Sequence, residues 1–277
     1  MTAARPSVAP VSDPARARPG PLLALRSWAE APFIALQFLT VLPPLVRRVP
    51  RADDLGRSEA FFPLVGLVLG TCLAGADYLL TLLVAPLVRD VLLVALLAAL
   101  TGALHLDGVV DTFDGLFAAV SPQRRLEIMR DPRAGSYGVV AVVLLLALKV
   151  AALASLPSTV RTSALMLAPC LGRWGIVLAT SRFAYARPEG MGRAFKESIR
   201  TAHVAVAAAI ALGAAGYVAG TPGAAIWFGV SVIVLLAGRW IAGRLGGVSG
   251  DIYGAICEVS ETGVLVAFGV HVGRLVG

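Results

Sequence analysis

A series of long apolar segments limits the folds open to this chain more than any other feature of its sequence. The segments cover residues 61–86, 91–106, 137–156, 161–180, 202–219, 224–245 and 254–273. About twenty apolar residues in a helix cross the hydrocarbon core of a bilayer. Because 57% of all residues are hydrophobic and only 15% are charged, an ordinary soluble core is excluded. We predict an all-α polytopic integral membrane protein with about seven transmembrane helices.

The region before the first span has a different composition. Residues 28–46 are apolar, but three prolines interrupt them and two arginines follow, so we predict an interfacial or re-entrant helix there. Residues 1–26 alternate proline, alanine, arginine and serine, which is typical of a disordered cytoplasmic tail. The predicted organisation is a tail of residues 1–26 and a single helical transmembrane catalytic domain of residues 27–277.

The basic residues are distributed unevenly among the loops. Most of them precede the first span, follow the second or follow the fourth, whereas the opposite side holds only Arg89, Arg161 and Arg274. Loops rich in lysine and arginine stay in the cytoplasm. We therefore predict a multi-pass membrane protein with a cytoplasmic N-terminus and a cytoplasmic-facing active site. The basic balance indicates anionic lipid rather than nucleic acid, because no surface of interleaved aromatic and basic residues is evident.

Three aspartates recur at helical spacing after the second span: Asp107, Asp111 and Asp114. At about 100° per residue, their side chains fall within roughly 60° of one another on one helix face. Like charges this close repel, so a cation must lie among them if all three are ionised. Oxygen-only ligands favour Mg²⁺, which completes its coordination with water and substrate phosphate. The alternative is a solvated acidic helix end, although Gly108 and Gly115 beside this face favour the close approach of a ligand.

Two further loops combine arginine with proline and glycine, as expected for contact with phosphate. The first holds Arg130, Asp131 and Arg133, and the second holds Arg187, with Lys196 just beyond it. Arginine forms paired hydrogen bonds with phosphate oxygens. Each stretch alone is typical of an ordinary loop. Their confinement to one side of the membrane favours a phosphate-binding site made of these three arginines and the lysine.

A glycine-rich stretch of residues 246–254 leads into the last span and adds a second acidic face. Asp251 and Glu258 are seven residues apart and share a helix face, whereas Glu261 is rotated from Glu258 by roughly 60°. Two acidic faces opposite each other suit a two-metal site or a metal with a catalytic base.

Three charged residues lie inside the apolar segments: Asp77, Lys149 and Arg173. Charges in the hydrocarbon are costly, so these residues are either functional or paired with one another. An ion path through a transporter is one interpretation. A transporter, however, needs polarity near mid-membrane on several helices, whereas the densest motifs here lie on one side.

The motifs occur in an order that resembles one enzyme family. The ordered set is His105-Leu-Asp107-Gly-x-x-Asp111-Thr-x-Asp114-Gly115, Glu127-Ile-Met-Arg130-Asp131-x-Arg133-x-Gly135, Tyr185-Ala-Arg187-x-Glu189-Gly190-x-Gly192 and Gly246-Gly247-x-x-Gly250-Asp251-x-x-Gly254-Ala-x-x-Glu258. It resembles the cobalamin synthase (adenosylcobinamide-GDP ribazoletransferase) family from about residue 33 to residue 264. Any one piece is weak, but the ordered series is highly specific.

The resemblance implies a Mg²⁺-dependent phosphotransferase for substituted phosphate groups that lies in the cell inner membrane. Such an enzyme joins adenosylcobinamide-GDP to α-ribazole, or to α-ribazole 5′-phosphate, and releases GMP in the last joining step of the cobalamin nucleotide loop. Mg²⁺ on the three aspartates would bridge the pyrophosphate, and the arginines would neutralise its remaining charge. Asp131 or Glu258 would accept the hydroxyl proton, and Asp251 is a third candidate catalytic residue. Other enzymes of nucleotide-loop assembly are expected partners.

A second enzyme class shares part of the acidic motif. CDP-alcohol phosphotransferases also cut a nucleotide pyrophosphate, with the pattern Asp-x-x-Asp-Gly-x-x-Ala-Arg followed by Gly and two Asp at fixed steps. The chain begins this pattern with Asp111-x-x-Asp114-Gly115-x-x-Ala118. The positions that should hold Arg, Gly, Asp and Asp are instead Ala119, Ile128, Pro132 and Ser136. The full motif is therefore absent.

Overall fold

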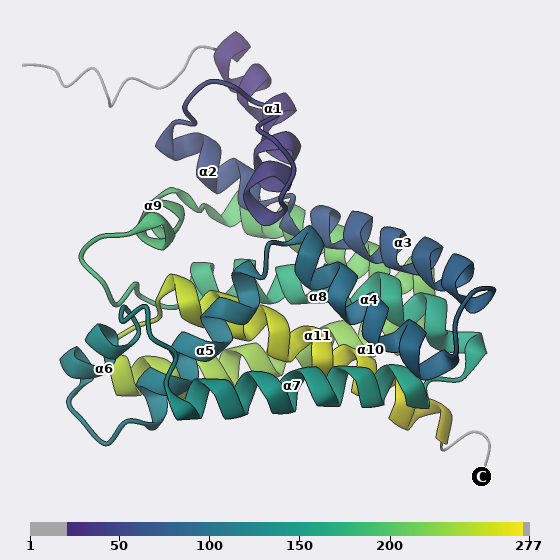
Figure 1. Cartoon of the computed structure of the whole chain (residues 1–277). Coiled ribbons are helices and arrows are strands. Elements are labelled where there is room, and N and C mark those ends of the chain that lie inside the picture. Colours follow the sequence, from purple (N-terminus) through teal and green to yellow (C-terminus); the bar gives the residue numbers. More distant parts are fainter. Residues whose placement is uncertain (1–20, 274–277) are drawn as a thin grey trace, which may run out of the picture.

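The computed structural model describes residues 21–273, and every named element in that part of the chain is a helix (Figure 1). The helices are α1 (Pro21–Leu39), α2 (Ala52–Glu59), α3 (Phe62–Thr81), α4 (Pro86–Leu100), α5 (Leu104–Phe117), α6 (Pro122–Ile128), α7 (Ser136–Ser155), α8 (Ser158–Arg182), α9 (Met191–Ser198), α10 (Thr201–Leu245) and α11 (Gly250–Gly273). The predicted all-α fold is confirmed. The predicted tail lies outside the described residues up to residue 20, and α1 begins at Pro21.

The number of crossings follows from the lengths of the helices. Five helices are long and apolar enough to span a membrane (α3, α7, α8, α10 and α11), and α4 with α5, bent by 91°, makes a sixth. Within α10, Gly220 has a non-helical φ of 61° and ψ of −143°. A Cβ atom on Gly223 would lie 2.1 Å from the Ala215 carbonyl oxygen, whereas a straight helix separates residues eight apart by about 12 Å. The chain therefore folds back within α10. If its two halves are counted separately and α4 with α5 is taken as one broken span, the number of crossings is the seven predicted.

Two predicted boundaries differ from those of the structure. The segment 91–106 ends early because Gly102 and Ala103 adopt left-handed conformations between α4 and α5. The helix predicted within 28–46 is α1, which ends at Leu39 and is not among the helices apolar enough to cross. Together with α2, it projects from one side of the bundle (Figure 1).

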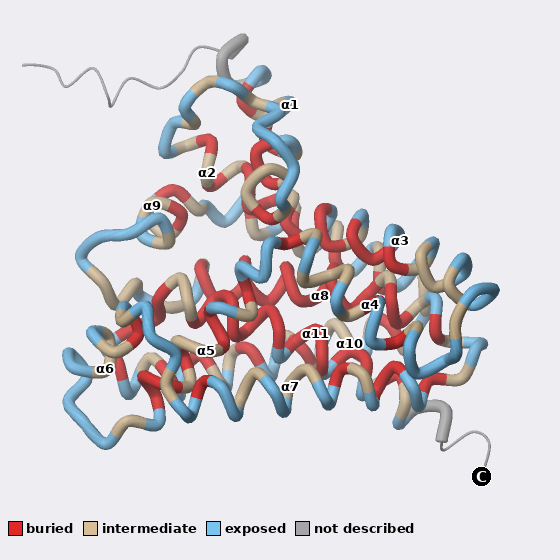
Figure 2. Tube along the Cα trace, in the orientation of Figure 1, coloured by how far each residue is buried: buried red, intermediate tan, exposed pale blue. Residues whose placement is uncertain are grey.

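Helix α8 lies at the centre of the bundle, and most of its residues are buried (Figure 2). The buried share of its most apolar window is 83%, against 22% for α7, so α8 packs against protein on every side and α7 leaves a broad face for lipid. Helix α3 approaches α8 through glycines. Cβ atoms on Gly66 and Gly70 would lie 2.2 Å and 2.4 Å from the carbonyl oxygens of Pro169 and Met166. Small residues at such contacts hold membrane helices together at close range.

Asp77 forms ion pairs at the end of the bundle away from the motif-bearing loops. The Arg161 Nε atom donates a hydrogen bond of 2.9 Å to Asp77, and the same guanidinium pairs with buried Asp90. Its Nη1 atom donates to the carbonyl oxygen of Leu153 at 2.8 Å. These contacts connect α3, α4, α7 and α8, so Asp77 has a structural partner.

Candidate active site

Two glycines bring α5 and α11 into backbone contact. A Cβ atom on Gly108 would lie 2.5 Å from the carbonyl oxygen of Asp251, and one on Gly254 would lie 3.1 Å from the carbonyl oxygen of His105. Only residues without a side chain permit this approach. It places the first turn of α11 against the α5 turn that carries Asp107, and both Asp107 and Asp251 line one cavity.

The carboxylates of Asp107, Asp111 and Asp251, which we call the acidic face, carry excess negative charge. Asp107 is exposed and Asp111 is half-buried. The negative charges of Asp251, Asp107 and Asp114 act on Asp111, and the positive charge of Arg187 opposes them. Partly buried like charges are unstable together unless a cation joins them. The arrangement therefore suits a bound cation.

The donor set fits Mg²⁺ that is shared with a substrate. Within residues 21–273, no three acidic, histidine or cysteine side chains converge closely enough to hold a metal by themselves. Mg²⁺ commonly takes one or two carboxylates and completes its octahedron with water and phosphate oxygens. Asp107 and Asp111 supply such oxygens. The residues match a metal that arrives with a pyrophosphate rather than one enclosed by protein.

Asp114, the third predicted metal ligand, is engaged with the backbone. Its two carboxylate oxygens accept N–H groups from Gly135 at 2.7 Å and Gly138 at 2.9 Å. These N–H groups lie at the start of α7, where unpaired donors and the helix dipole favour a carboxylate. Asp114, which is 9% exposed, thus fixes to α5 the end of the loop that holds Arg130, Asp131 and Arg133, which we call the arginine loop.

Arg187 is the predicted phosphate-binding residue that lies closest to the acidic face. Its Nη2 atom is 2.6 Å from a carboxylate oxygen of Asp251, and it also donates to the carbonyl oxygen of Met129 at 3.4 Å. The buried Nε–H group has no hydrogen-bond partner among the described residues. Arg187 therefore connects three motifs.

The loop that carries Arg187 is tied to the glycine-rich loop before α11. Val248 donates its N–H to the carbonyl oxygen of Ala184, and Ala186 donates to the carbonyl oxygen of Val248, both at 2.8 Å. A Cβ atom on Gly247 would lie 2.5 Å from the carbonyl oxygen of Ala184. The close pairing of these loops positions Arg187 relative to Asp251.

The remaining residues of the arginine loop lie at the surface. Arg133 holds Asp131 through hydrogen bonds of 2.9 Å and 2.8 Å, and these bonds lower the pKa of the Asp131 carboxyl to about 2. A carboxylate of such low pKa is a weak base. Arg130 is exposed on the same loop, so its guanidinium remains accessible to a phosphate.

Lys196 is not placed at the acidic face. Its ammonium group donates to the carbonyl oxygens of Thr180 at 2.8 Å and Ser181 at 3.0 Å. Both carbonyls belong to the last turn of α8, where they lack helical partners. Lys196 thus caps α8, and this geometry does not bring it together with the predicted arginines.

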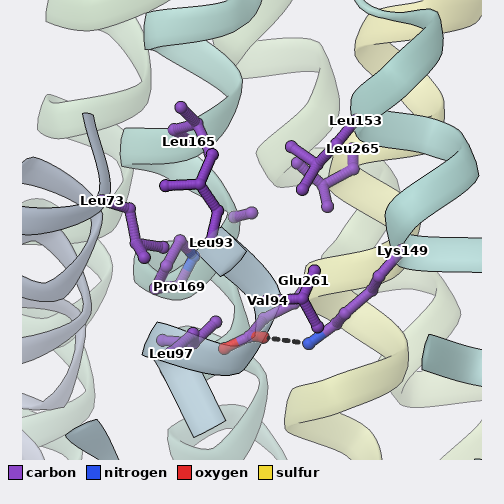
Figure 3. A pocket seen from close by; sticks show the side chains of 11 residues that line it. Leu73, Leu93, Val94, Leu97, Lys149, Leu153, Leu165, Pro169, Glu261 and Leu265 are labelled. Carbon is purple, nitrogen blue, oxygen red and sulfur yellow. Dashed lines mark hydrogen bonds and ion pairs between the residues drawn. The ribbon is translucent and has the colours of Figure 1, made fainter. Parts of the chain in front are cut away.

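Glu258 also lies elsewhere, in a network of buried charges inside the bundle. Lys149 donates to Glu258 and to Glu261, both at 2.5 Å, and Arg173 pairs with Glu261. Figure 3 shows Lys149 and Glu261 pointing toward one another among leucine side chains. The charges predicted inside the membrane are therefore paired, and Glu258 is bound to Lys149 rather than available to a surface substrate.

Glu59 is a residue at the site that the sequence analysis did not identify. This last residue of α2 is 1% exposed and lines the same cavity as Asp107 and Asp251. It stands just before the first predicted span, where an acidic residue is ordinary. Only the packing of α2 and α9 beside α8 reveals that it faces the site.

Comparison with known proteins gives one consistent result. The sequence profile of the cobalamin-5-phosphate synthase family matches residues 31–269. A protein from Geotalea daltonii named adenosylcobinamide-GDP ribazoletransferase is 43% identical over 229 residues, which cover 83% of this chain and 92% of the relative. Relatives of the same name from Desulforamulus reducens and Stutzerimonas stutzeri are 39% and 41% identical, covering 84% and 87% of this chain and 93% and 98% of theirs. No solved structure matches.

Proposed function

The chain belongs to the cobalamin-5-phosphate synthase family, and we propose that it catalyses the reaction for which its relatives are named, adenosylcobinamide-GDP ribazoletransfer. The substrates are adenosylcobinamide-GDP and α-ribazole or its 5′-phosphate. The products are adenosylcobalamin, or its 5′-phosphate, and GMP. The observation that carries this proposal is the acidic face with Arg187 against it, because this pairing suits a cation-bound pyrophosphate.

The residues around the acidic face would bind different parts of the donor. Asp107 and Asp111 would hold Mg²⁺, which neutralises charge on the pyrophosphate and on the departing GMP when it is bound. Arg187 would bind phosphoryl oxygens with its guanidinium, which lies against Asp251. Arg130, exposed on the neighbouring loop, would add a second guanidinium.

The transfer step is a displacement at the phosphorus nearer the cobinamide. The ribazole hydroxyl oxygen, or the corresponding oxygen of the phosphorylated acceptor, forms the new P–O bond while the bond to the GMP oxygen breaks. We assign proton acceptance to Asp251, because it is the one of the three candidates that lies on the acidic face, where it also pairs with Arg187. Asp131 is held by Arg133 on a surface loop, and Glu258 is bound to Lys149 inside the bundle.

The orientation of the protein completes the proposal. The motif-bearing loops lie at one end of a multi-pass helical bundle, and their arginines favour the cytoplasm. We place the protein in the inner membrane with a cytoplasmic N-terminus. Water-soluble donor and acceptor then reach the acidic face from the cytoplasm, where the enzymes that make both substrates are candidate partners.

Labelled donor tests this function. Purified protein in detergent is given α-ribazole, Mg²⁺ and adenosylcobinamide-GDP carrying ³²P only in the cobinamide-side phosphate. The label should appear in the cobalamin product, and the released GMP should be unlabelled. Label leaving as GDP would contradict displacement at the cobinamide-side phosphorus.

A further inference from the structure

A cavity of about 210 Å³ lies directly beside the acidic face. Asp107, Asp251, Glu59 and Tyr253 all contribute to its lining. The displacement described above uses neither Glu59 nor Tyr253. The cavity therefore has lining residues that the reaction at the phosphates leaves unexplained.

The walls of this cavity are largely aromatic and apolar. Phe38, Phe62 and Phe195 all line it. The rings of Phe38 and Phe195 are 4.8 Å apart, and those of Phe38 and Phe62 stack at 5.9 Å with an interplanar angle of 17°. Apolar pockets with aromatic walls and a few polar groups are typical of sites for flat organic rings.

Two polar groups in the cavity have no partner within the described residues. The Glu59 Oε2 atom and the Tyr253 hydroxyl meet no partner at hydrogen-bonding geometry, although Thr180 lies beside both and the two residues are only 1% and 6% exposed. Buried polar atoms are normally paired because leaving them unpaired is costly. Burial also raises the pKa of the Glu59 carboxyl to about 8, so at neutral pH it is protonated and donates an O–H group.

We propose that this cavity binds the planar aromatic base of the ribazole acceptor, with Glu59 and Tyr253 at its polar edge. The inference rests on the ribazoletransferase function proposed above. Because α-ribazole 5′-phosphate keeps its 5′-phosphate in the product, the attacking oxygen is a hydroxyl of the ribose ring, and a base in the cavity leaves the ribose beside the acidic face.

The chemistry of the cavity distinguishes the two bases present in the substrates. The ribazole base has one unsubstituted ring nitrogen, which accepts a hydrogen bond, and is otherwise apolar. Guanine presents several donors and acceptors that apolar walls would leave unpaired. The single lone pair of that nitrogen accepts one hydrogen bond, which the O–H group of either Glu59 or Tyr253 can donate, and this favours the ribazole base.

Steady-state kinetics of Tyr253→Phe test the proposal. This change removes only a hydroxyl that has no hydrogen-bond partner within residues 21–273, so the fold should be retained. The KM for α-ribazole should rise about tenfold, as expected for one lost hydrogen bond, while the KM for adenosylcobinamide-GDP stays unchanged. Tyr78→Phe, at a tyrosine that is 72% exposed, is the matched control and should leave both KM values unchanged.

Substitutions of Glu59 and a direct binding measurement test the same proposal independently of the Tyr253→Phe kinetics. Glutamine keeps the shape and an N–H donor, so its effect on the KM for α-ribazole should be smaller than that of Glu59→Leu. Calorimetry with α-ribazole alone should show weaker binding in Tyr253→Phe than in the wild type.

The outcomes separate the two proposals. A raised KM for adenosylcobinamide-GDP instead of α-ribazole would assign the cavity to guanine and overturn the inference. Unchanged KM values together with unchanged α-ribazole binding in Tyr253→Phe, Glu59→Gln and Glu59→Leu would also overturn it. Failure of the wild type to release GMP would instead refute the proposed function, while the binding measurement still decides the cavity.

Discussion

The acidic face and the buried charge network contain similar residues but balance their charges differently. In the network, each buried carboxylate has a cation: Lys149 lies 2.5 Å from both Glu258 and Glu261, and Arg173 also pairs with Glu261. On the acidic face, several carboxylates share Arg187. Breaking a buried ion pair is strongly destabilising, because it leaves an uncompensated charge. Charges left in excess at a surface can instead be balanced by a cation that arrives with a ligand.

This contrast predicts opposite consequences for equivalent substitutions. Removing a carboxylate from the network should unfold the protein, because a buried cation loses its partner. Removing one from the acidic face should spare the fold and stop the reaction. The following variants are arranged from the largest expected effect to the smallest.

Glu261→Gln should produce the largest loss of stability. Glu261 is 1% exposed and pairs with two cations, so its loss should cost about 3–5 kcal/mol in the free energy of unfolding. The thermal unfolding midpoint in detergent measures this effect. Glu197→Gln, which breaks an exposed pair with Arg193, is the control and should shift the midpoint little. Equal midpoints for the two variants would remove the distinction drawn here.

Asp111→Asn should abolish most of the activity without unfolding the protein. The change keeps the size of the side chain and removes a proposed Mg²⁺ ligand, so turnover should fall about 100- to 1,000-fold. The unfolding midpoint should match that of the wild type. Near-normal GMP release by both Asp111→Asn and Asp107→Asn would mean that the acidic face is only a solvated surface.

Gly108→Ala tests whether the contact between α5 and α11 assembles the site. The new Cβ atom would meet the Asp251 carbonyl oxygen at 2.5 Å, so the helices must separate and Asp251 must move. Small displacements of reacting groups are costly, and we expect turnover to fall about tenfold or more. Gly213→Ala, where a Cβ atom meets nothing within 4 Å, should have no effect. Similar turnover in both variants would show that the close approach does not matter.

Asp114→Asn should have the smallest effect of the four. One of the two hydrogen bonds to the N–H groups of Gly135 and Gly138 must be lost, because the amide nitrogen cannot accept. We expect a loss of about 1 kcal/mol in the free energy of unfolding and a smaller fall in turnover than with Asp111→Asn. If turnover falls as far as in Asp111→Asn with no change in stability, Asp114 also belongs to the metal site.

The sequence predicted the helix face on which a residue lies more reliably than the depth of that residue in the bundle. The spacing of Asp251 and Glu258 correctly places them on one side of α11, but seven residues of helix separate them by about 10 Å along the axis. Glu258 consequently lies with Lys149 inside the bundle. Periodicity reports the angle around a helix, whereas the depth depends on where the helix begins relative to its neighbours.

The sequence also did not predict contacts between segments that lie far apart along the chain. The three aspartates share a helix, as their spacing predicts, yet nothing in that spacing indicates that Asp114 binds the backbone at the start of α7. Glu59 belongs to the site only because α2 packs near α8, where burial leaves its carboxyl without a full set of partners. Local patterns locate motif residues, and tertiary packing decides which of them meet.

The central claim is that the acidic face binds Mg²⁺ together with the pyrophosphate of the donor. The most direct measurement is GMP release as a function of free Mg²⁺ concentration, for the wild type and for Asp107→Asn. The wild type should be inactive in excess chelator and should saturate with Mg²⁺. The variant should retain its fold and need at least about tenfold more Mg²⁺ for half-maximal turnover, since a carboxylate ligand is lost. Equal turnover in excess chelator, or identical Mg²⁺ curves for the two proteins, would contradict the account.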